Sequence, residues 1–216
     1  MMRSKYADYF NHDQDAGGYD QDVQNEHDPI RAGYRAVLRW VGNNVKPASH
    51  ALDLGSGTGN TIKALPSSCN VTAVDVSIRM TEVARSKLGG RQVEFISCDI
   101  LEFFDKHENM SFDAVVSTYT LHHLPADEKM ELFRRVSRVL PVTAPFLIGD
   151  LMYEGQAGRE RILKEYSAAH PSLATDFEDE FFWDIVDMKE RLSLAGWSTS
   201  WRRFSDLSWG VVASRG

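Results

Sequence analysis

Short apolar runs alternate with amphipathic segments along most of the chain. Runs typical of strands cover 50–55, 71–76, 92–99, 112–119 and 144–151. Between them, the spacing of apolar positions predicts helices at 58–65, 77–88 and 126–140, and a short helical stretch after residue 99. This alternation predicts a parallel sheet with helices on both faces.

The segment before the first strand departs from this alternation. Residues 1–27 are rich in Asp, Asn, Gln and Gly, which is typical of an extension or of short helices. Asp28 suits a helix N-cap and Pro29 suits the first helical position. Apolar residues then recur at helical spacing from Ile30 to Val45. We therefore expect a helix that begins at Asp28.

The end of the chain departs from it as well. Residues 154–183 predict one or two inserted helices, and residues 184–195 predict another helix, which ends at Gly196. Only Ser205–Asp206 separates the last two strand-like runs. A connection that short requires a hairpin, so the last strand should be antiparallel to its neighbour.

Composition and charge narrow the class of protein. With 216 residues, 43% of them hydrophobic and 25% charged, the chain has the profile of a folded domain and not of a disordered one. No apolar run reaches the roughly 20 residues of a membrane span, and the polar start lacks a signal core. Two cysteines, Cys69 and Cys98, are too few for a disulfide framework, so a reduced, cytoplasmic setting is expected. The net charge of −7 opposes non-specific phosphate binding, and nucleic acid is not expected as a partner.

A glycine-rich loop joins the first strand of the alternation to its helix. Its glycines, Gly55, Gly57 and Gly59, allow a tight turn and a close approach to a ligand, although a ligand-free turn is the alternative. A dinucleotide fingerprint needs a further glycine where Asn60 stands, and the carboxylate of Asp53 would repel a pyrophosphate. A ligand that carries a ribose, an amine and a sulfonium fits better.

Two more acids end the next two strands. Asp75 lies 20 residues after Gly55, a distance at which an acid accepts hydrogen bonds from ribose hydroxyls. Asp99 is placed to accept from an adenine amino group, with a plain N-cap as the alternative. The carboxyl ends of consecutive strands are where open α/β sheets bind ligands.

These motifs together are similar to a known enzyme class. LDLGSGTGN, VDVS, the Cys98–Asp99 strand end and FDAVVSTYTLHHL resemble the class I S-adenosylmethionine (AdoMet)-dependent methyltransferases. More narrowly, YDQDVQNEHDPIRAGY and VSTYTLHHLPADEK resemble the bacterial YrrT-type methyltransferases. One departure is Pro141–Pro145, where the class usually has a glycine pair.

The resemblance implies a fold and a cofactor site. The fold is a Rossmann-like, seven-stranded, mostly parallel sheet with an antiparallel last strand, an N-terminal lid and a helical insertion after the fifth strand. It implies one domain, with a lid at 1–27, a cofactor-binding core at 28–150, a helical substrate cover at 151–183, and a final helix and hairpin at 184–216. The AdoMet-binding residues that it implies are Tyr19, Asp53, Gly55, Ser56, Gly57, Gly59, Asp75, Val76, Cys98, Asp99, Ile100 and Thr118.

The acceptor chemistry is expected after the fourth strand. His123 is the favoured pocket-lining base, with His122 and Tyr119 as further candidates, although the two histidines alternatively only shape the turn. At most one of the two histidines is expected to face the pocket. Adjacent histidines seldom converge on one ion and no carboxylate follows at helical spacing, so no metal is expected.

The sequence therefore predicts direct, metal-free methyl transfer to a small-molecule acceptor by a monomer or homodimer, with no membrane partner. A non-catalytic AdoMet-binding protein, an NAD-dependent oxidoreductase and an RNA methyltransferase are the alternatives. The missing glycine at Asn60 and the carboxylate of Asp53 disfavour the oxidoreductase, and the negative net charge disfavours the RNA enzyme.

Overall fold

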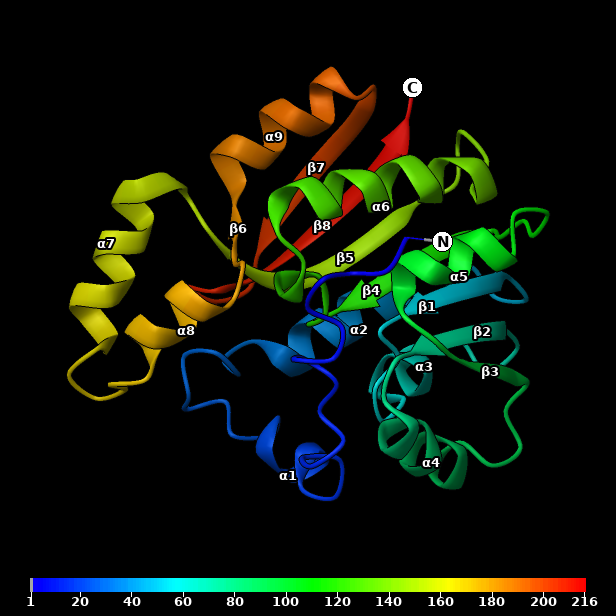
Figure 1. The fold of residues 1–216 in the computed structure, drawn as a ribbon, viewed down its shortest axis with the longest axis horizontal. Helices are drawn as coiled ribbons and strands as arrows, with labels where there is room; N and C mark the ends of the chain where they lie inside the picture. The colour runs from blue at the N-terminus through cyan, green and yellow to red at the C-terminus, as the bar shows by residue number, and fades with distance from the viewer. Residues whose placement is uncertain (1) are drawn as a thin grey trace.

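The computed structural model describes residues 2–216, so the first residue of the expected lid lies outside the described residues. Its sheet has the strand order β3-β2-β1-β4-β5-β8-β7, with the two-residue β6 paired to β5 beside this path (Figure 1). The strands are β1 (His50–Leu54), β2 (Asn70–Asp75), β3 (Val93–Ser97), β4 (Ala114–Thr118), β5 (Phe146–Tyr153), β6 (Trp183–Asp184), β7 (Trp197–Arg203) and β8 (Ser208–Arg215).

The strand directions agree with the sequence. Strands β1 to β5 pair in parallel, and β8 is antiparallel to both β5 and β7. The predicted mostly parallel sheet with an antiparallel last strand is thus confirmed, and β6 is a short addition to it. The hairpin around Ser205–Asp206 places β8 between β5 and β7.

Helices cover both faces of this sheet (Figure 1). They are α1 (Tyr19–Asp22), α2 (Tyr34–Asn44), α3 (Asn60–Ala64), α4 (Ile78–Lys87), α5 (Ile100–Lys106), the 3₁₀ turn η1 (Leu121–His123), α6 (Ala126–Val139), α7 (Gly155–Tyr166), α8 (Leu173–Asp179) and α9 (Ile185–Leu194). One hydrophobic cluster joins the sheet to α5, α6 and α9, and a second joins it to α2, α3 and α4.

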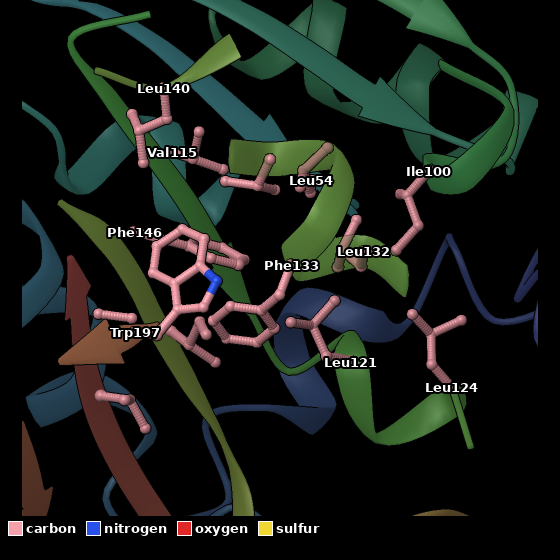
Figure 2. Packing of buried hydrophobic residues seen from close by; sticks show 14 of the residues in the cluster. Leu54, Ile100, Val115, Leu121, Leu124, Leu132, Phe133, Leu140, Phe146 and Trp197 are labelled. Carbon is pink, nitrogen blue, oxygen red and sulfur yellow. The ribbon is translucent and has the colours of Figure 1, made fainter. Parts of the chain in front are cut away.

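Each central strand contributes to both clusters because successive side chains of a strand point to opposite faces. In β4, Val115 packs into the cluster with α6 and Val116 into the cluster with α2. Figure 2 shows the first cluster around Phe133 of α6, whose ring lies 5.1 Å from that of Phe146 and 5.1 Å from that of Trp197. Burial on both faces explains why the strands are continuous apolar runs in the sequence.

The first long helix begins later than the sequence predicts. The expected helix from Asp28 is wrong for its first six residues, because α2 begins at Tyr34. The Asp28 side chain instead accepts a hydrogen bond from the backbone N–H of Ile30, which is a local turn. Gly33 then has a φ of 83°, a left-handed conformation that separates this turn from the helix.

A third hydrophobic cluster lies beyond the carboxyl ends of the strands. It brings Val23 of the N-terminal segment together with Tyr119, which follows β4, and with Leu173 and Phe177 of α8. The N-terminal segment and the inserted helices therefore meet at the edge of the sheet where open α/β folds bind ligands.

Candidate functional site

A cavity of about 750 Å³ opens at the carboxyl ends of the parallel strands. Loops that follow β1, β2, β3 and β4 line it on one side, and the N-terminal segment lines it on the other. Twelve of the fifteen residues singled out from the sequence are among its lining residues: Tyr19, Gly55, Ser56, Gly57, Asp75, Val76, Asp99, Ile100, Thr118, Tyr119, His122 and His123.

The other three expected residues do not line the cavity. Gly59 has a φ of 81°, and a Cβ there would lie 2.6 Å from Leu88, so this glycine serves the packing of the loop on α4. Cys98 packs against the core, and burial raises the pKa of its thiol to about 11. Asp53 lies beneath the loop and is fully buried.

Asp53 is a buried carboxyl group without a protein partner. Among residues 2–216, neither of its oxygens has a hydrogen-bond partner. Burial, and secondarily the charge of Asp75, raise its pKa to about 8. Buried polar groups are usually satisfied, so an exception of this kind needs an explanation. A positively charged group held by the glycine loop would favour the ionised form of Asp53.

The glycine loop is shaped as a cradle. Gly55 has a φ of 74°, and a Cβ there would lie 2.2 Å from the Thr120 side chain. Gly57 has a φ of 51°, and a Cβ there would meet nothing within 4 Å in the described chain. The loop therefore packs closely on one side and leaves space on the other for a ligand to approach the backbone.

Asp75 is positioned by the backbone around it. One carboxylate oxygen accepts a hydrogen bond of 2.7 Å from the N–H of Gly57, and the other accepts one of 2.8 Å from Ser77. Each oxygen keeps a second lone pair, so the carboxylate can still accept from ligand hydroxyls. Burial raises the pKa of Asp75, which backbone hydrogen bonds oppose. Ser77 caps α4.

Asp99 caps a helix and lies at the wall of the cavity. Its Oδ1 caps α5 by accepting from the N–H groups of Leu101 and Glu102, and it also accepts from Ser4 at 3.2 Å. The residue lines the cavity at the same time. The capping alternative is therefore correct, and it coexists with a position at the cavity wall.

The N-terminal segment, residues 2–27, is hydrogen-bonded to the loops that follow β1 and β2. Asp20 accepts hydrogen bonds from Thr58 at 2.6 Å and from Asn60 at 2.9 Å, both in or next to the glycine loop, and pairs with Lys87 at 2.6 Å. Asp13 accepts from the Ser77 hydroxyl at 2.5 Å. Sequence reasoning missed Asp13, because nothing in a polar segment marks which acid reaches the core.

A histidine–aspartate pair lies at the other end of the cavity. His122 Nδ1 is 2.5 Å from Oδ1 of Asp150, which is fully buried in β5. Asp150 also accepts from the backbone N–H of His122 at 3.1 Å and from the indole of Trp183 at 3.3 Å. In the neutral ring, this network places the proton on Nδ1 of His122 and leaves Nε2 with a lone pair.

Both histidines line the cavity, contrary to the expectation that at most one does. His123 stacks on Phe10 with ring centroids 4.2 Å apart, and its Nε2 lies 3.2 Å from Nε2 of His12. Burial lowers the pKa of His123 well below its ordinary value, which makes it a poor proton acceptor at neutral pH. The hydrogen bond to Asp150 favours His122 as the base instead.

Tyr119 is held away from proton transfer. It has a φ of 49°, and its hydroxyl lies 2.9 Å from the Ser208 hydroxyl. Burial raises the pKa of this phenol, so it stays protonated. Tyr119 therefore lines the cavity, and its hydrogen bond to Ser208 of β8 holds the side chain in place.

The two histidines converge further than the sequence indicated. In the η1 turn their ring centroids are 4.0 Å apart. Glu180, at the end of α8, brings a carboxylate to them, and one ligand atom from each of the three residues lies within 4.8 Å of the others. No spacing rule reveals Glu180, because it comes from a different element of the fold.

The chain is similar to known methyltransferases over most of its length. The methyltransferase domain family matches residues 51–142. The uncharacterized methyltransferase YrrT of Bacillus subtilis (strain 168) is 30% identical over 203 residues, which cover 92% of this chain and 93% of that protein. An uncharacterized methyltransferase of Bacillus pumilus (strain SAFR-032) is 29% identical and covers 99% of both chains.

Solved structures share the fold. The DhpI-SAM-HEP complex has a TM-score of 0.70 at 21% identity and covers 99% of this chain and 98% of DhpI. Magnesium protoporphyrin IX methyltransferase (ChlM) from Synechocystis PCC 6803, with bound SAH, has a TM-score of 0.65 at 20% identity. The match covers 97% of this chain and 98% of ChlM. No helix within residues 2–216 has both the length and the apolar character needed to cross a bilayer. The chain therefore belongs to the YrrT-type family of methyltransferases, as its motifs predicted.

Proposed function

We propose that this methyltransferase transfers the methyl group of AdoMet to a small-molecule acceptor held in the same cavity. The observation that carries the proposal is that the glycine loop, Asp75, Asp99 and His122, which pairs with Asp150, all line one cavity of about 750 Å³. AdoMet supplies a methyl group on a positively charged sulfur, which is electrophilic without activation by a metal.

The donor end of the cavity fits such a cofactor. The glycine loop leaves room for close approach at Gly57, and Asp75 offers lone pairs to ribose hydroxyls. Asp53 is buried and has no hydrogen-bond partner within the described chain, so its negative charge would favour binding of the cationic amino acid part of AdoMet above it. Asp99 and Ile100 line the cavity where the adenine is expected.

The acceptor end of the cavity supplies a base. His122 Nε2 takes the proton of an acceptor O–H, N–H or S–H group as that atom forms its bond to the methyl carbon. Asp150 fixes the ring and stabilises the imidazolium that results. Direct in-line transfer also requires that water be kept away from the methyl carbon.

The N-terminal segment and α8 serve as lid and cover in this proposal. Tyr6, Phe10, His12 and Tyr19 of the segment line the cavity, as do Asp176 and Glu180 at the α8 side. A cavity covered by both segments suits a compact acceptor better than a nucleic acid. The net charge of −7 also disfavours a nucleic acid. ChlM is named for a small molecule, magnesium protoporphyrin IX, which supports the same class of acceptor.

Calorimetric titration with AdoMet, its demethylated product and NAD tests the donor side. Incubation of metabolite extracts with labelled AdoMet, followed by mass identification of the labelled product, tests the acceptor side. We expect binding of AdoMet but not of NAD, and a labelled small molecule that the His122→Asn variant forms far more slowly. Preference for NAD refutes the proposal, and AdoMet binding without any labelled product indicates a non-catalytic AdoMet-binding protein.

A further inference from the structure

Three side chains with metal-binding atoms meet at the acceptor end of the cavity. His122, His123 and Glu180 each offer one such atom, and these atoms lie within 4.8 Å of one another. Nε2 of His122 is 3.6 Å from Oε2 of Glu180, which is too far for a hydrogen bond. Two ligands bound tetrahedrally at zinc distances of about 2.0–2.2 Å lie roughly 3.3–3.6 Å apart, so this separation suits a shared ion.

A buried carboxylate orients the central ligand. Nδ1 of His122 hydrogen-bonds to Asp150, which directs the lone pair of Nε2 away from β5. Asp150 is itself held by the N–H of Leu151 at 2.8 Å and by the indole of Trp183. A histidine that donates its other ring N–H to a carboxylate is the usual arrangement around protein-bound zinc.

Backbone contacts keep Glu180 next to the histidines. The N–H of Phe181 donates to the carbonyl oxygen of His122 at 2.7 Å, which ties the end of α8 to the η1 turn. The ammonium of Lys129 bridges the carbonyl oxygens of Leu124 and Phe181 at 2.5 and 2.6 Å. These contacts therefore hold the backbone next to Glu180 against the turn that carries the two histidines.

A second carboxylate lies close to Glu180. Asp176, one turn before Glu180 on α8, lines the same cavity, and the two carboxylates repel each other. A divalent ion bound to Glu180 would offset this repulsion. Two imidazoles and one carboxylate form a donor set typical of catalytic zinc sites, which keep one position open.

We infer that His122, His123 and Glu180 bind one Zn²⁺ ion whose open coordination position faces the acceptor. This inference replaces the sequence-based expectation of no metal. The ion binds an acceptor oxygen or sulfur and lowers its pKa, so that the proton leaves to water before the heteroatom bonds to the methyl carbon and the carbon–sulfonium bond breaks. In the metal-bound protein His122 is a ligand in place of a base. That role depends on the proposed function, whereas ion binding itself does not.

Metal titration of the untagged, chelator-treated protein tests the site. We expect Zn²⁺ to bind at one ion per chain in calorimetry, and Co²⁺ to give visible absorption bands of a low-symmetry nitrogen and oxygen site. Glu180→Gln keeps the size of the side chain and should weaken Zn²⁺ binding by about 10- to 100-fold, as should loss of the orienting carboxylate in Asp150→Asn. Asp179→Asn, an exposed acid one residue away, is the matched control and should bind as the wild type does.

Two results overturn the inference. Equal Zn²⁺ affinity in the wild type and Glu180→Gln means that these residues form no site. Equal methyl transfer by chelated and Zn²⁺-loaded protein means that the ion has no part in activating the acceptor. AdoMet affinity is measured separately on the chelated protein, so failure of the metal site and failure of the proposed function give different results.

Discussion

Binding of AdoMet should release a proton from Asp53 near neutral pH. Burial raises the pKa of this carboxyl to about 8, and neither of its oxygens has a partner in the described chain. A cationic ligand above it stabilises the ionised form and lowers the pKa in the complex. At neutral pH the free protein therefore holds a proton there that the complex does not.

The sign and size of the effect follow from this difference. The ligand prefers ionised Asp53. The affinity for AdoMet should therefore rise with pH until about pH 8 and level off above it. While the pKa in the complex stays well below the working pH, each unit of acidification costs about tenfold in affinity, or about 1.4 kcal/mol. Between about pH 7.5 and about pH 5.5 we expect a loss approaching 100-fold.

Calorimetry in two buffers of different ionisation enthalpy measures both the affinity and the protons released. Asp53→Asn keeps the shape of the side chain and cannot ionise, so it should bind with a much flatter pH dependence. The comparison also removes contributions from Asp75 and Asp99, whose pKa values burial raises in both proteins. Proton release near zero in the wild type, or the same pH dependence in Asp53→Asn, refutes the assigned role of Asp53.

Three further predictions follow. His122→Asn should leave the affinity for AdoMet within about twofold in calorimetry and reduce kcat by about 10²- to 10⁴-fold in steady-state kinetics. An equal loss of affinity and kcat would mean that His122 only lines the cavity and does not act as a base. Removal of residues 1–20 should weaken AdoMet binding and abolish turnover, because it deletes the Asp20 contacts to the glycine loop, and unchanged affinity and rate would exclude the lid role. Phe133→Ala should lower the free energy of unfolding by about 3–5 kcal/mol in a urea titration, since Phe133 is fully buried at the centre of its cluster, and a loss below about 1 kcal/mol would contradict that packing.

The sheet could be predicted because each of its signals is local. Apolar runs at 71–76 and 112–119 mark strands wherever they lie in space, and the Ser77 cap acts through bonds within three residues. The hairpin at Ser205–Asp206 is fixed by chain length alone. The error at Asp28 is local too, because Gly33 takes a left-handed φ that the helical spacing did not reveal.

The acceptor site could be predicted only in part, because it depends on contacts between distant segments. The sequence identified both histidines but favoured His123, whereas the structure favours His122. The Asp150 that pairs with His122 lies 28 positions away in the chain and reaches it only once β4 and β5 are adjacent. Glu180 reaches the histidines only because Phe181 bonds to the η1 turn.

The position of β8 has a consequence for how the chain is made. Its eight residues, Ser208–Arg215, leave the ribosome after β5 and β7, yet they lie between these two strands in the sheet. Until they emerge, β5 has an open edge, and unpaired strand edges are templates for aggregation. A nascent or prematurely terminated chain that lacks this strand should therefore depend on chaperones, although its cofactor-binding half is already complete in sequence.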